Sequence, residues 1–155
     1  MTLTVQTESF TQCVPELRPL FQQHWEELAI HKDRMPLDPQ YDQYAERERR
    51  GILRLWTVRR DGEIAAYHTA QAAPGFHYGS TLIAHGDLTY VAPQHRNRGG
   101  LILPLMRRVE RDLRQCGVQL WVVNYKQHNP LGMPQVLGAL GFEPTDIYCG
   151  KWIGA

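Results

Sequence analysis

A change in the spacing of apolar residues constrains the fold of this chain more than any other feature. Residues 15–28 carry apolar side chains every three or four positions, which is the pattern of an amphipathic helix. Residues 52–58 and 63–70 instead alternate apolar with polar side chains, as strands do, and they flank Asp61 and Gly62, a pair that favours a tight hairpin. The chain therefore combines helices with a β-sheet.

Turn-forming residues divide the remainder of the chain into further elements, because proline and glycine interrupt helices and strands. The sequence predicts strands at residues 2–6, 52–58, 63–70, 81–91, 118–125 and 147–153, and helices at residues 15–31, 39–50, 100–115 and 128–140. The strand at 118–125 is apolar enough to be buried on both faces. This order predicts an α/β fold with a mixed sheet, in one domain that spans residues 1–155.

Composition argues against several classes of protein. The chain has 17 Lys and Arg and 16 Asp and Glu, which gives a net charge of +1. This charge does not favour binding to a polyanion, and a nucleic-acid partner is not expected. The apolar runs are far shorter than the ~20 residues that span a bilayer, and the N-terminus lacks the features of a secretion signal. We therefore expect a soluble cytoplasmic protein with no membrane partner.

Possible metal ligands do not form a recognised pattern. Cys13, Cys116 and Cys149 are widely scattered and include no CxxC pair, so reduced and partly buried thiols are expected. His24 and His31 share a helical face with Glu27, but the spacing is not that of a known metal site. Packing is the simpler interpretation, and no metal is predicted.

A glycine turn between a strand and a helix is the most informative segment. It has the sequence YVAPQHRNRGGL over residues 90–101. Such a turn gathers free backbone N–H groups at the positive end of a helix, where a phosphate can bind. The patterns GxxxxGK[ST] and GxGxxG are absent, so the usual loops for nucleoside triphosphates and dinucleotides are not indicated.

With its neighbours, this turn resembles motif A of the GCN5-related N-acetyltransferases. Residues 96–101 follow the family pattern Q/R-x-x-G-x-G/A, LTYVAP at 88–93 resembles the end of the family's fourth strand, and LGALGFEP at 137–144 resembles the end of its fourth helix. The resemblance implies a central, mostly antiparallel sheet that is splayed between the fourth and fifth strands, with helices on both faces. It also implies acetyl-CoA as the cosubstrate.

The resemblance assigns a set of residues to the cosubstrate, with the pyrophosphate on the glycine turn. These residues are Tyr90, Val91, Arg96, Asn97, Arg98, Gly99, Gly100, Leu101 and Asn129. Arg107 is a further candidate for the phosphates. Leu101 departs from the family preference for Gly or Ala and could crowd the pyrophosphate.

A base is needed because an alkyl amine has a pKa near ~10.4 and must lose a proton before it attacks a thioester. Asp87 stands where many family members carry a glutamate, and His85 shares its face by the two-residue period of a strand. Gly86 suits the bulge that splays this strand in the family. His128 could face the same cleft from the other side.

The acid that protonates the departing thiolate is less clear, because Leu137 replaces the tyrosine that is usual in the family. Tyr148 and Tyr125 are candidate substitutes, and Tyr148 is our choice. Loss of activity is the alternative that remains open.

The sequence therefore predicts an acetyl-CoA-dependent N-acetyltransferase that moves an acetyl group to a primary amine of a small molecule or protein, by direct attack in a ternary complex. The alternative is a catalytically weak or inactive protein of the same fold that binds acyl-CoA. The amine acceptor is expected near Asp42, Glu46, Glu48 and the loop at 76–79, and a homodimer is left open.

Overall fold

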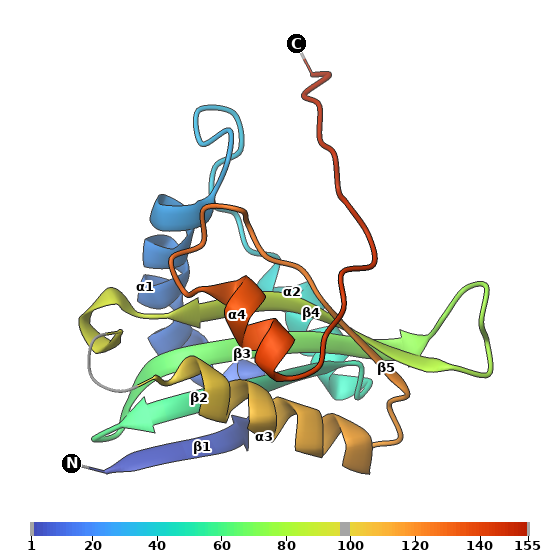
Figure 1. Cartoon of the computed structure of the whole chain (residues 1–155). Coiled ribbons are helices and arrows are strands. Elements are labelled where there is room, and N and C mark those ends of the chain that lie inside the picture. Colours follow the sequence, from blue (N-terminus) through green and yellow to red (C-terminus); the bar gives the residue numbers. More distant parts are fainter. Residues whose placement is uncertain (1, 97–99, 155) are drawn as a thin grey trace.

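The computed structural model describes residues 2–96 and 100–154 of the chain (Figure 1). Its elements are β1 (Leu3–Glu8), α1 (Phe10–Leu28), α2 (Tyr41–Arg49), β2 (Leu53–Arg60), β3 (Glu63–Pro74), β4 (Leu82–Val91), the short 3-10 helix η1 (Pro93–His95), α3 (Ile102–Gln115), β5 (Leu120–Val123) and α4 (Met133–Ala139). The predicted α/β fold is confirmed, and so is the predicted order of elements as far as α4.

The five strands form one sheet in the order β1-β2-β3-β4-β5. Neighbouring strands are antiparallel except for β4 and β5, which are parallel. The strand at 118–125 was expected to be long and buried on both faces, but β5 has only four residues and Leu120 is exposed. Because β5 lies at the edge of the sheet, one side of its backbone has no neighbouring strand among the described residues.

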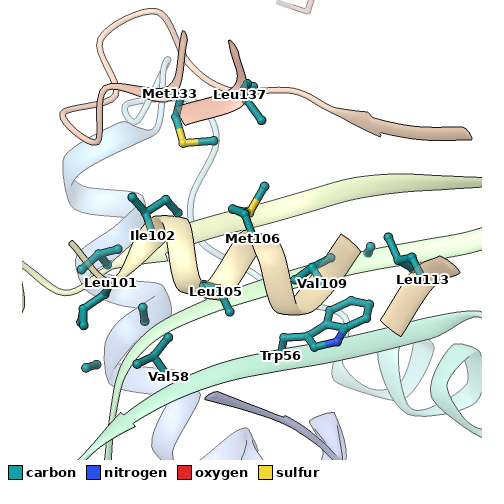
Figure 2. Close-up of a cluster of buried hydrophobic side chains, with 14 of the residues drawn as sticks. Trp56, Val58, Leu101, Ile102, Leu105, Met106, Val109, Leu113, Met133 and Leu137 are labelled. Carbon is teal, nitrogen blue, oxygen red and sulfur yellow. The ribbon is translucent and has the colours of Figure 1, made fainter. Parts of the chain in front are cut away.

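Helices cover both faces of the sheet, as predicted. On one face, Phe10 and Leu17 of α1 pack with Tyr67 of β3 and Tyr90 of β4. On the other face, the apolar side of α3 packs on β2, and α4 adds to the same cluster. Figure 2 shows this second cluster, with Trp56, Val58, Leu101, Ile102, Leu105, Met106, Val109, Leu113, Met133 and Leu137.

The hairpin between β2 and β3 turns at the residues that the sequence indicates. Asp61 has φ 50° and Gly62 has φ 92°, so both residues adopt the left-handed backbone of a tight hairpin turn. The turn aligns Arg60 with Glu63 in the register of the two strands.

The predicted last strand at 147–153 is wrong. This segment has no helical or strand structure, and the C-terminal tail leads away from the sheet in Figure 1. Ile147 and Ile153 are about nine-tenths exposed, at 92% and 89%. Alternating apolar residues made the segment resemble a strand, but a strand also needs a neighbour that bonds its backbone, and here the tail has none among the described residues.

Two further expectations can be compared with the structure. Of the three thiols expected to be partly buried, Cys13 is buried, whereas Cys116 and Cys149 are exposed. Within the described residues, no helix combines the length and apolar character needed to cross a membrane.

Glu48 of α2 holds the first turn of α1. Its carboxylate accepts hydrogen bonds from the backbone N–H groups of Phe10 at 2.5 Å and Thr11 at 3.0 Å, and from the Thr11 hydroxyl at 2.6 Å. A negative charge at this position also interacts favourably with the positive end of α1. Burial raises the pKa of Glu48, but the hydrogen bonds outweigh it, so the pKa lies below its usual value.

We expect Glu48→Ala to lower the free energy of unfolding by about 1–2 kcal/mol, because several N-terminal donors of α1 lose their acceptor. Urea unfolding followed by circular dichroism measures this change. Since the folded-state pKa is lowered, the contribution is present above the unfolded-state pKa and is lost as pH falls through the folded-state pKa. Glu46→Ala is the control, since Glu46 only pairs with Arg49 on the surface; equal stability of both variants would contradict the assignment.

Candidate active site

A cavity of about 720 Å³ opens where β4 and β5 separate. The parallel pairing of these strands ends at Gly86 and Val123. Beyond this pair, Asp87, Leu88 and Thr89 line one side of the cavity, and residues 124–129 line the other. The predicted splay between the fourth and fifth strands is therefore confirmed.

The remaining walls come from α1, α2, the connection between them and the C-terminal tail. These wall residues are Phe21, His24, Trp25, Leu28, residues 29–30 and 35–39, Tyr44 and Tyr148. The tail contacts the α1–α2 connection, because the Trp152 ring lies 6.2 Å from the His31 ring and 5.7 Å from the Arg34 guanidinium. Two segments far apart in the sequence thus form neighbouring parts of the cavity mouth.

A β-bulge places Asp87 at the cavity. In the register of β3 and β4, Thr69 pairs with Leu88 and Ala70 pairs with Gly86, so Asp87 is an additional residue on β4. The bulge expected at Gly86 is present. A side chain at this glycine would collide with His68, because an added Cβ would lie 2.9 Å from its Cε1 atom.

The surroundings of Asp87 raise its affinity for a proton. Burial raises the pKa of Asp87, and the Tyr44 hydroxyl and Arg47 oppose this effect only in part. The Tyr44 hydroxyl donates a long hydrogen bond of 3.5 Å to Oδ2 of Asp87. Burial and the neighbouring Asp87 raise the pKa of Tyr44 to about 12, so the phenol remains a donor near neutral pH. The carboxylate is still reached by solvent through the cavity, and it can therefore exchange protons with a bound molecule.

The structure brings most of the predicted catalytic candidates to this cavity. Asp87 and Tyr148 both line it, as do Tyr125 and His128. His85 is exposed on β4 and lies opposite Gln71 in the register, but it is not among the residues that line the cavity.

Most residues that line the cavity were not anticipated from the sequence, and Tyr44 and Asp38 are two of them. Tyr44 lies in a highly charged helix whose sequence does not reveal that one face turns inward, where its ring stacks on Phe10 at 4.6 Å. Asp38, which directly precedes the helix predicted at 39–50, also lines the cavity.

The predicted cosubstrate residues do not all lie at one place in the structure. Asn97, Arg98 and Gly99 lie outside the described residues. Tyr90, Val91 and Leu101 are buried in the two cores, so the Leu101 side chain packs with α3 and is directed away from solvent. Gly100 is exposed, with no atom within 4 Å of an added Cβ. Asn129 lines the cavity, where its side chain accepts a hydrogen bond of 2.9 Å from the Leu131 N–H.

Arg96 is held by the protein itself. Its guanidinium donates two hydrogen bonds to Glu27 of α1, at 2.6 and 2.5 Å, and its Nε donates to the Val91 carbonyl at 3.0 Å. These hydrogen bonds lower the pKa of Glu27. The ion pair fastens the end of β4 to α1, a contact between residues 69 positions apart that local sequence patterns do not reveal.

The histidine on the same helix is a packing residue, as the sequence suggested. His24 Nδ1 lies 2.7 Å from the Tyr67 hydroxyl, and its ring stacks on Tyr90 at 4.6 Å. Burial lowers the pKa of His24 to about 4, so it is neutral near pH 7. Across the described part of the chain, no three His, Cys, Asp or Glu side chains gather as metal ligands would.

The acidic residues expected near an acceptor lie elsewhere. Asp42, Glu46 and Glu48 do not line the cavity, and Glu48 is used to cap α1. The loop at 76–79 projects at the far end of the β3–β4 hairpin in Figure 1, and it is likewise not part of the cavity. The carboxylates that do line the cavity are Asp38 and Asp87.

Leu137 and Arg107 lie on the α3–α4 side of the sheet. Leu137 is buried against the α3 cluster, as Figure 2 shows, and it does not line the cavity. Arg107 is exposed and lines a shallow groove between α3 and α4 together with Arg111 and Arg114.

No protein-family model and no curated protein matches this chain. Solved structures do match it over nearly their whole length. An aminoglycoside acetyltransferase from an uncultured soil metagenomic sample, in complex with trehalose, matches with a TM-score of 0.75 at 10% identity, over 98% of this chain and 97% of that chain. A predicted acetyltransferase from Clostridium acetobutylicum, solved with acetyl-CoA, has a TM-score of 0.69 at 13% identity, over 98% and 97%. AAC(6')-Iy in complex with the bisubstrate analog CoA-S-monomethyl-acetylneamine has a TM-score of 0.66 at 19% identity, over all of both chains.

These similarities and the splayed sheet show that this chain shares the fold of those solved structures. More particularly, it is the fold of the GCN5-related N-acetyltransferases, and the resemblance seen in the sequence motifs is confirmed at the level of the fold.

We expect Glu27→Gln to lower the free energy of unfolding by about 1–2 kcal/mol, because the partly buried Arg96 guanidinium loses its charged partner. Urea unfolding measures the change. The matched control is Glu26→Gln at the neighbouring exposed position, which should leave stability unchanged. A Glu27 variant as stable as the wild-type protein would show that the pair does not hold β4 to α1.

Proposed function

We propose that this protein is an acetyl-CoA-dependent N-acetyltransferase that acetylates a primary amine by direct attack on the thioester. The observation that carries the proposal is the Asp87 carboxylate, whose pKa is raised and which lines the cavity formed where β4 and β5 separate. Structures with this fold that hold acetyl-CoA or a CoA analog support the choice of cosubstrate.

The residues present fit a phosphate-bearing cosubstrate. The first turn of α3 has no acidic residue and no side-chain cap among the described residues, so the N–H groups of Ile102 and Leu103 are suited to bind an anion. No described residue other than the chain neighbours of Gly100 lies within 4 Å of a Cβ added there, and Arg107 is exposed with no carboxylate partner in the same part of the chain. Arg98 would complete this set, as predicted from the sequence. Acetyl-CoA, when bound, supplies the acetyl thioester that the amine attacks.

Each of the chain's own groups at the cavity would have a distinct task. Asp87 takes the proton of the bound ammonium, directly or through water, so that the nitrogen lone pair becomes free to attack. The Tyr44 hydroxyl orients this carboxylate by its hydrogen bond. Tyr148, or alternatively Tyr125, returns a proton to the departing thiolate; because a thiol has a pKa near ~8.5, this step is not demanding. His85, predicted from the sequence as a partner of Asp87, does not line the cavity and is given no task there.

A second candidate function is an acyl-CoA-binding protein without catalysis. It is favoured by Leu137, which stands where the family usually carries its acid and is buried in the core. The two functions differ in turnover, since both bind the cosubstrate.

We expect saturable binding of acetyl-CoA in calorimetry, and amine-dependent release of CoA thiol that a thiol reagent detects. Asp87→Asn should reduce kcat by about 100-fold or more, since the base is lost, while acetyl-CoA binding stays unchanged. In the wild-type protein, kcat/KM should fall as pH falls through the raised pKa of Asp87, because the protonated carboxyl cannot accept a proton.

Asp42→Asn is the control for this prediction, because Asp42 is exposed on α2 and does not line the cavity. Absence of acetyl-CoA binding at millimolar ligand would reject the cosubstrate. Binding without thiol release from any amine would favour the non-catalytic alternative, and an unchanged rate in the Asp87 variant would reject the assignment of the base.

A further inference from the structure

We propose that the acceptor is a small primary amine that carries a single positive charge on an apolar body, such as an arylalkylamine. This inference rests on the proposed function and names the substrate class of the same cavity. A cavity of about 720 Å³ is within the range of small-molecule sites.

The cavity walls are mainly apolar. Five aromatic side chains and several aliphatic ones surround the space next to Asp87. The aromatic residues are Phe21, Trp25, Tyr44, Tyr125 and Tyr148, and the larger aliphatic residues are Leu28, Ile30, Met35, Leu37 and Leu88. Such walls bind the hydrocarbon part of a ligand, and aromatic faces also attract a cationic amine.

Charge at the cavity limits how many positive charges the acceptor can carry. Asp38 and Asp87 are its carboxylates, Lys126 is a cation, His128 is a second imidazole at the wall, and His24 is neutral near pH 7 because burial lowers its pKa to about 4. If Asp87 receives the reacting ammonium, Asp38 is the one carboxylate left on the described walls, and Lys126 carries the opposite charge. A polyamine with three or more ammonium groups would then lose hydration without a carboxylate for each group.

The exposure of apolar side chains at the cavity also supports an acceptor with an apolar body. Ile30, Met35, Tyr125 and Tyr148 are exposed large apolar residues of the described chain, and all four line this one cavity. An apolar ligand would cover them, which is favourable because it removes apolar surface from water.

The connection between α1 and α2 is fixed well enough to act as a wall. The Trp25 indole N–H donates to the Met35 carbonyl at 3.2 Å, and the Met35 N–H donates to the His31 carbonyl at 2.8 Å. Met35 therefore has a defined position at the mouth, where its exposed side chain is suited to contact the body of an acceptor.

An acceptor panel tests the proposal in two readouts, thiol release with acetyl-CoA and amine binding by calorimetry in the presence of CoA. The probes are 2-phenylethylamine, hexylamine, spermidine, kanamycin and a peptide with a free N-terminus. We expect kcat/KM for 2-phenylethylamine to exceed that for spermidine and for kanamycin by at least about tenfold. We also expect 2-phenylethylamine to bind more tightly than either of these amines.

Met35→Glu should raise the KM for 2-phenylethylamine by about fivefold or more with little change in kcat, and should shift the preference towards spermidine. Leu3→Glu is the matched control, because Leu3 is 45% exposed against 44% for Met35 but lies on β1 and does not line the cavity. It should change neither constant.

The outcomes separate this inference from the proposed function. Tighter binding of 2-phenylethylamine without any thiol release would support the acceptor class and reject catalysis. Preference for spermidine, kanamycin or the peptide in either readout, or the absence of binding by every amine, would overturn the acceptor class whether or not the protein proves to be an acetyltransferase.

Discussion

The separation of β4 from β5 is the constraint on which the rest of the structure depends. The two strands share only four residue pairs, from Ile83–Leu120 to Gly86–Val123. Immediately beyond the last pair, the bulge removes Asp87 from the regular register with β3. Continued pairing of β4 with β5 would fill this space with a backbone ladder, so the early end of the ladder creates both the cavity and the position of its carboxylate.

The wall opposite this opening depends on two contacts that charged side chains make at α1. Glu48 of α2 binds the first turn of α1, and Arg96, just after β4, binds Glu27 near its last turn. Because α1 is fastened near both ends, Phe21 and Trp25 are held between those contacts at the cavity. Charged residues thus act here mainly as structural connections, and they leave the cavity itself largely apolar.

Local patterns predicted the elements of the fold and failed where long-range contacts decide the structure. The hairpin at Asp61 and Gly62 follows from spacing and turn chemistry alone. The tail at 147–153 alternates like a strand, yet pairing requires a partner that its own sequence cannot specify. At the site, Asp87 was identified through a resemblance to a family. The structural roles of Glu27 and Tyr44 were not, because both depend on contacts with residues distant in the sequence.

The apolar walls would serve the chemistry as well as the choice of acceptor. In water, an aspartate pKa near ~3.9 and an alkylamine pKa near ~10.4 are too far apart for easy proton transfer. Burial disfavours the charged form of each group, so it raises the pKa of Asp87 and would lower that of an amine bound beside it. An acceptor that displaces water from these apolar walls would therefore bring the two pKa values closer together. A more polar cavity would hold a polycationic amine more firmly, but it would also keep the ammonium protonated and oppose the attack.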